Sequence, residues 1–227
     1  MLRFSPTAWA KLLYFRDRTD NEVGGFGITR ADDLLYVEEF LTVCQEVTCV
    51  SVKFDDQSVA DFFETQVDLG RRPEQFARLW LHSHPGNSPE PSGTDQDTFA
   101  RVFGGCQWAL MFIIAQSDAC HARLDFNIGP GGQVLIPVAV DYRRPFGPSS
   151  QEAWEAEYRD HVIAASWPDN PPPTPPENPP LPDLGSYGLP YDFLDEFEAM
   201  EPAERQFVLD ELAARPELWD EQEVMQL

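Results

Sequence analysis

Apolar residues recur at helical spacing in three segments of the N-terminal part of the chain. The first follows Ser5-Pro6, where serine suits an N-cap and proline suits the first helical position. Its Trp9, Leu12 and Leu13 then form one helical face. The pattern therefore predicts helices after Ser5, over Ser58–Leu69 and over Thr94–Phe103.

Between these helices lie segments with the two-residue alternation or the short continuous apolar run that is typical of strands. The predicted strands are Glu22–Ile28, Leu34–Val43, Val47–Phe54, Leu79–His84, Trp108–Ala115, Cys120–Ile128 and Val134–Val140. Interspersed strands and helices of this kind predict an α/β (α+β) fold, with a mixed β-sheet flanked by helices.

The composition changes after Trp167, where a proline-rich run begins. Such a run favours an extended polyproline conformation and acts as a semi-rigid spacer, with an SH3-type ligand as the alternative. Beyond it, Phe193, Leu194, Phe197 and Met200 have the spacing of one helical stripe. We therefore expect four segments, namely a domain over 1–145, a connecting acidic helix over 146–167, a Pro-rich linker over 168–190 and an acidic helical tail over 191–227.

Charge narrows the range of partners. The chain has 39 acidic and 16 basic residues, a formal net charge of -23. Binding to nucleic acid or to anionic lipid depends on Lys and Arg, so we expect neither partner. The first residues lack the long apolar core of a signal peptide, and four cysteines are too few for a disulfide scaffold. These features favour a cytoplasmic protein.

The candidate chemistry lies at the end of one predicted strand, in His82-Ser83-His84. Side chains two positions apart on a strand share a face, so both imidazoles can point at one ion. Asp95 follows after a loop long enough to return a carboxylate to the same point. Two histidines and a carboxylate form a familiar catalytic zinc set, although iron or manganese suits the same ligands. The alternative is that the histidines only cap the strand or hold adventitious metal.

The full run is His82-Ser83-His84, seven residues, then Ser92-Gly93-Thr94-Asp95, with Glu22 and Gly24 upstream. This H-[ST]-H-x7-S-x-x-D pattern resembles the signature of the JAMM (JAB1/MPN+) zinc metalloproteases, in particular the prokaryotic JAB-domain type. The resemblance covers residues 1–142 and implies the cytidine-deaminase-like JAB/MPN fold.

The resemblance also implies a role for each residue. His82, His84 and Asp95 would bind one Zn²⁺ per chain. Glu22 would be the general base that takes a proton from water, and Ser92 would donate a hydrogen bond to the developing oxyanion. The alternatives are that Glu22 is only a strand-edge carboxylate and that Ser92 is only an N-cap.

By the same resemblance, the activity would be hydrolysis of amide or isopeptide bonds at the C-terminus of a ubiquitin-like protein, either deconjugation or precursor processing. The acidic tail would bind partners such as E1- or E2-like pathway proteins. Two alternatives remain, namely a DNA-repair-associated JAB-type protein and a non-catalytic binding scaffold.

Overall fold

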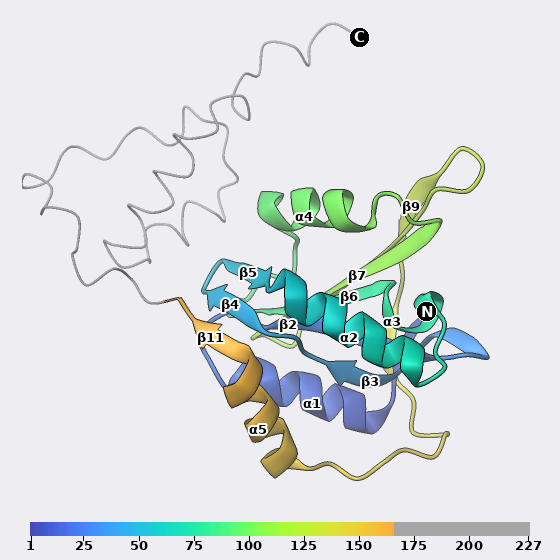
Figure 1. Ribbon diagram of the computed structural model, residues 1–227. Coiled ribbons are helices and arrows are strands. Elements are labelled where there is room, and N and C mark those ends of the chain that lie inside the picture. The colour runs from blue at the N-terminus through green and yellow to red at the C-terminus, as the bar shows by residue number, and fades with distance from the viewer. Residues whose placement is uncertain (166–227) are drawn as a thin grey trace, which may run out of the picture. The chain divides into compact units, whose positions relative to one another are not determined.

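The computed structural model describes residues 1–165 (Figure 1). These residues belong to a compact unit, Met1–Ser166. The Pro-rich linker 168–190 and the acidic tail 191–227, with its stripe from Phe193 to Met200, lie outside the described residues. No helix within 1–165 is both long and apolar enough to cross a bilayer.

The unit contains short strands and five helices, whose bounds are as follows. The strands are β1 (Leu2–Phe4), β2 (Gly24–Arg30), β3 (Asp33–Leu41), β4 (Gln45–Thr48), β5 (Ser51–Phe54), β6 (Leu79–His84), β7 (Trp108–Ala115), β8 (Cys120–Phe126), β9 (Gly132–Leu135), β10 (Val138–Val140) and β11 (Val162–Ala164). The helices are α1 (Pro6–Asp17), α2 (Asp56–Asp68), α3 (Pro73–Phe76), α4 (Gly93–Phe103) and α5 (Gln151–His161).

The main sheet is mixed, and its strand order is β10-β1-β3-β2-β6-β7-β8-β9. Its two edge strands, β9 and β10, are joined only by Ile136-Pro137. Since each residue spans at most about 3.6 Å, the ends of the edge strands lie within about 11 Å of each other, so the sheet is strongly curled. The linking dipeptide forms backbone hydrogen bonds with a strand on each side. The Ile136 N–H donates to Ala122 O of β8 at 2.9 Å, and Pro137 O accepts from the Leu2 N–H of β1 at 2.8 Å.

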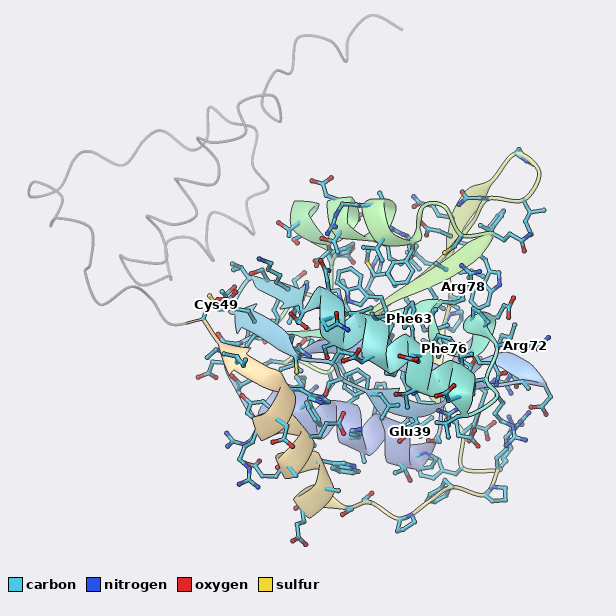
Figure 2. All side chains as sticks on the ribbon, in the orientation of Figure 1. Glu39, Cys49, Phe63, Arg72, Phe76 and Arg78 are labelled. Carbon is cyan, nitrogen blue, oxygen red and sulfur yellow. The ribbon has the colours of Figure 1, made fainter. Side chains whose placement is uncertain are left out.

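Helices cover both faces of this sheet (Figure 1). On one face, α1 and α5 pack on a core that includes Phe15, Phe40 and Phe112. On the other face, α2 and α4 pack on a second core that includes Trp80 and Met111. Figure 2 shows Phe63 of α2 beside Phe76 of α3, with ring centroids 5.3 Å apart. The predicted architecture of a mixed sheet flanked by helices is confirmed.

The prediction of one strand over Val47–Phe54 is wrong, because the segment turns at Cys49-Val50 and forms the β4–β5 hairpin. The prediction of one strand over Val134–Val140 is also wrong. Pro137 cannot donate to a ladder, so the chain leaves β9 there and continues as β10 on the opposite edge.

Residues 146–165 belong to the same compact unit. Trp154 of α5 is 7% exposed and belongs to the first core. After α5, β11 pairs in parallel with β4, so that a smaller sheet of order β11-β4-β5 forms. The connecting helix expected over 146–167 is therefore observed as α5 followed by a strand.

Candidate metal centre

The two histidines stand at the end of β6, a strand whose predicted bounds are confirmed. His82 is fully buried, and Trp80 stacks on its ring with centroids 4.4 Å apart. Ser83 points to the opposite face, where its Oγ accepts a hydrogen bond from the Val23 N–H at 3.0 Å. The alternation of the strand thus places His82 and His84 on one side, as expected.

Asp95 is oriented by the start of α4. Ser92 is the N-cap of this helix, and its Oγ accepts a hydrogen bond from the Asp95 N–H at 3.1 Å. In return, Asp95 Oδ2 accepts from both the N–H and the hydroxyl of Ser92, each at 2.8 Å. This reciprocal capping box fixes the Asp95 carboxylate beside the histidines. Ser92 is therefore an N-cap that also lies at the centre.

Glu22 reaches the centre from the turn before β2. Its N–H donates to Thr48 O at 2.9 Å, and β2 then pairs with β6 so that Gly24 lies opposite His82. Glycine is needed in this stretch, because a Cβ at Gly25 would stand 2.4 Å from the Leu41 carbonyl oxygen. Close approach of β2 to its neighbours brings the Glu22 carboxylate to the histidines.

The four predicted residues Glu22, His82, His84 and Asp95 each offer a ligand atom, and these atoms lie within 4.8 Å of one another. Asp95 Oδ1 is 3.3 Å from His82 Nε2, and its Oδ2 is 3.4 Å from His84 Nε2. Glu22 Oε1 is 3.6 Å from His84 Nε2. Burial is nearly complete, since the most exposed of the four side chains, His84, is only 11% accessible. The structure thus brings together every residue of the predicted ligand and base set.

The electrostatics of this cluster are compatible with a bound cation. Burial and the nearby Asp95 raise the pKa of Glu22 well above its ordinary value, while burial lowers the pKa of His82. Burial also opposes ionisation of Asp95, but the close His82 and His84 and the hydrogen bond from the Ser92 hydroxyl outweigh it, so its pKa is lowered. Within residues 1–165, neither Glu22 nor Asp95 forms an ion pair with a lysine or arginine. A buried carboxyl group without such a partner either takes up a proton or is stabilised by a bound cation.

The histidine nitrogens are also compatible with a bound cation. Nε2 of His82 and Nε2 of His84 are buried without a hydrogen-bond partner. Nδ1 of His84 lies 3.1 Å from Ser88 O, and because a carbonyl only accepts, this nitrogen carries the proton. The lone pair of His84 is then on Nε2, which faces the carboxylates. Two imidazoles and two carboxylates match the nitrogen and oxygen ligands that zinc takes, and the centre can hold a metal ion.

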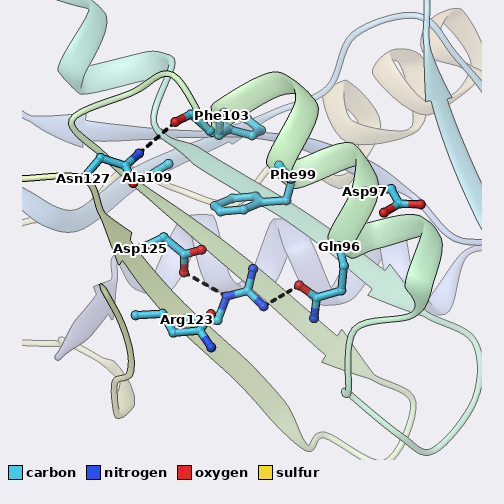
Figure 3. A pocket seen from close by; sticks show the side chains of 11 residues that line it. Gln96, Asp97, Phe99, Phe103, Ala109, Arg123, Asp125 and Asn127 are labelled. Carbon is cyan, nitrogen blue, oxygen red and sulfur yellow. Dashed lines mark hydrogen bonds and ion pairs between the residues drawn. The ribbon is translucent and has the colours of Figure 1, made fainter. Parts of the chain in front are cut away.

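His121 and Glu90 lie beside the centre, and no role there was predicted for either of them from the sequence. His121 on β8 is 8% exposed, and its Nδ1 lies 3.3 Å from Oε2 of Glu90. The alternation of His121, Arg123 and Asp125 with apolar residues was the available signal. Figure 3 shows Arg123 and Asp125 in a cavity of about 380 Å³ beside α4, which none of the four clustered residues lines.

No family model and no curated protein matches the chain. The class of site is therefore defined by its own side chains, as a buried cluster of two histidines and two carboxylates that can hold a metal ion.

Proposed function

We propose that the chain is a zinc-dependent hydrolase of amide or isopeptide bonds, of the JAMM type and with the JAB/MPN fold. The observation that carries the proposal is the convergence of Glu22, His82, His84 and Asp95 within 4.8 Å in a buried site. The sequence motif supports the same proposal, because its residues match the ligand, general-base and oxyanion-donor positions of the JAMM signature.

His82, His84 and Asp95 would hold the ion. A bound zinc ion supplies Lewis acidity and lowers the pKa of a coordinated water to about 7. Glu22 suits proton transfer, because its carboxylate lies 3.6 Å from His84 and burial raises its pKa well above the ordinary value; it would take a proton from water and pass it to a departing amine. The Ser92 hydroxyl, which donates to Asp95 here, would turn to donate to the substrate carbonyl oxygen.

The substrate would be the extended C-terminal tail of a ubiquitin-like protein or its conjugate. The edge strand β5 supports this proposal, since it ends the smaller sheet and lies beside the start of β2. An extended peptide that added to this edge would run close to Glu22. Binding of E1- or E2-like proteins by the acidic tail stays a prediction from sequence.

The experiment combines metal analysis with turnover. The purified full chain should contain one zinc ion and cleave a linear fusion of a ubiquitin-like protein to a reporter. Glu22→Gln should keep the zinc but lose about 100-fold or more in turnover, because only the proton acceptor is removed. His84→Ala should lose the zinc, and Glu64→Gln on the exposed surface of α2 is the matched control.

Each outcome assigns a different role. Full turnover in Glu22→Gln would place the base elsewhere, and loss of zinc in that variant would make Glu22 a ligand. Zinc binding without cleavage in the parent chain would favour the binding scaffold. Salt-dependent DNA binding would favour the DNA-repair-associated alternative.

A further inference from the structure

Strand β8 presents the polar side chains of His121, Arg123 and Asp125 to the face on which the metal centre lies. His82 pairs with Ile113 of β7, and Ile113 pairs with His121 of β8. Directly paired residues of neighbouring strands point to the same face, so His121 lies in line with His82, two strands away. Arg123 shares this face, and its guanidinium lies 5.4 Å from the ring centroid of Phe99 in α4.

Stability alone gives no reason for a histidine at position 121. Its Nδ1 contacts Glu90, but its Nε2 is buried without a hydrogen-bond partner. A buried polar atom that stays unpaired destabilises a fold, so an apolar residue here would be more favourable. The contact with Glu90 is an interaction that an apolar residue at this position would not make.

Glu90 belongs to the segment Pro85–Ser92, which we call the metal loop. Two residues of this loop orient metal ligands: Ser88 O fixes the proton on Nδ1 of His84, and Ser92 holds the carboxylate of Asp95. Glu90 lies between them in the sequence. Its position therefore bears on the orientation of both ligands, in the way that outer-shell partners set the geometry of a metal site.

The first half of the metal loop is held from the β7–β8 turn. Gly86 O accepts from the Gln116 N–H at 3.0 Å, and Asn87 O accepts from the Ser117 hydroxyl at 2.7 Å. The second half is held from β8 by the contact of His121 with Glu90.

Beyond the loop, Arg123 Nη1 donates to Gln96 Oε1 at 2.6 Å, next to Asp95 (Figure 3). Strand β8 thus contacts the chain on both sides of the Ser92–Asp95 capping box.

We propose that His121, acting through Glu90, is a positioning residue of the metal centre. It holds the second half of the metal loop, so that Ser88 and Ser92 keep His84 and Asp95 in ligating orientation. This inference rests on the metal-binding part of the proposed function.

The test is zinc affinity of the full chain, measured by competition with a chromophoric chelator. Direct outer-shell partners change metal affinity by about 10–100-fold, and His121 acts one contact further away, so Glu90→Ala and His121→Leu should each weaken binding about three- to tenfold. The double variant should be no weaker than either single one, because both remove the same contact. His121→Gln, whose amide can still donate to Glu90, should stay within about twofold of the parent. Glu64→Ala is the matched control, on the exposed surface of α2.

A second readout is independent of zinc. Hydrogen exchange of residues 86–92 should be faster in Glu90→Ala and His121→Leu, while β7 and β8 stay protected. Unchanged affinity and exchange in the exposed Glu90→Ala variant would overturn the proposal even if His121→Leu failed to fold, and so would additive effects in the double variant. If the parent chain bound no zinc, the proposed function would fail, and exchange of the loop alone would decide this inference.

Discussion

The substitution Glu157→Ala should destabilise the described unit strongly, because Glu157 is the partner of a buried lysine. Lys11 Nζ of α1, on a side chain only 6% exposed, lies 2.5 Å from Oε2 of Glu157 in α5. The other oxygen, Oε1, accepts from the Thr42 N–H at 3.0 Å and from the Thr42 hydroxyl at 2.9 Å. One carboxylate thus joins α1, α5 and the end of β3.

The magnitude follows from what the substitution leaves behind. Removing one member of a buried ion pair costs about 3–5 kcal/mol, since the remaining charge is buried without compensation. Glu157 is 19% exposed, so water can reach the site and the lower end, about 3 kcal/mol, applies. Thr42 also loses two hydrogen bonds to a charged acceptor, of which water replaces a part, which adds about 1 kcal/mol. We expect a loss of about 4 kcal/mol.

Urea denaturation of the full chain with a chelator present, followed by tryptophan fluorescence, measures this loss. Glu64→Ala should change the free energy of unfolding by less than about 0.5 kcal/mol, as is usual for an exposed site. Lys11→Met combined with Glu157→Ala should recover part of the loss, because no unpaired charge then remains. A loss below about 1 kcal/mol for Glu157→Ala, or no recovery in the double variant, would refute the reasoning.

Two further predictions concern the packing of β2 and the loss of stability at low pH. Gly25→Ala should cost about 2–3 kcal/mol, because its Cβ would stand 2.4 Å from Leu41 O, whereas a Cβ at Gly93 meets nothing within 4 Å. Equal melting temperatures of Gly25→Ala and Gly93→Ala would contradict this. Hydrogen bonds from Arg18 and Tyr14 lower the pKa of Glu155 to about 2. A depressed carboxyl pKa gives stability that is present above the ordinary value of 4.5 and is lost as the pH falls toward 2. The free energy of unfolding of Glu155→Gln should therefore depend less on pH over that window than that of the parent. An unchanged pH dependence would contradict this role of Glu155.

Much of the candidate metal centre could be predicted from sequence, because the placement of several of its side chains is local. The two-residue period of a strand places His82 and His84 on one face and Ser83 on the other. The capping box joins Ser92 and Asp95, which are three positions apart, so its geometry is also encoded within one helical turn. In the structure the ligand atom of Glu22 lies within 4.8 Å of those of His82, His84 and Asp95.

What the sequence could not supply are contacts between distant segments. The pattern of Leu2–Phe4 is too short to predict a strand, yet β1 pairs in parallel with both β3 and β10. The contact of Glu90 with His121 likewise depends on which strand follows β7 in the sheet. Hydrophobic periodicity describes a segment's faces, but it does not describe the neighbour that each face meets.

The curled sheet also affects how the chain folds while it is being synthesised. Every clustered residue, from Glu22 to Asp95, leaves the ribosome before β10, which must pair with β1. At about 5–20 residues per second, Val140 is made roughly 7–28 s after the first residue, and α5 still later. Until then β1 lacks one of its two neighbours, and pairings of such long sequence separation form slowly. The nascent chain therefore carries all four side chains of the candidate metal centre for seconds before its sheet can close around them.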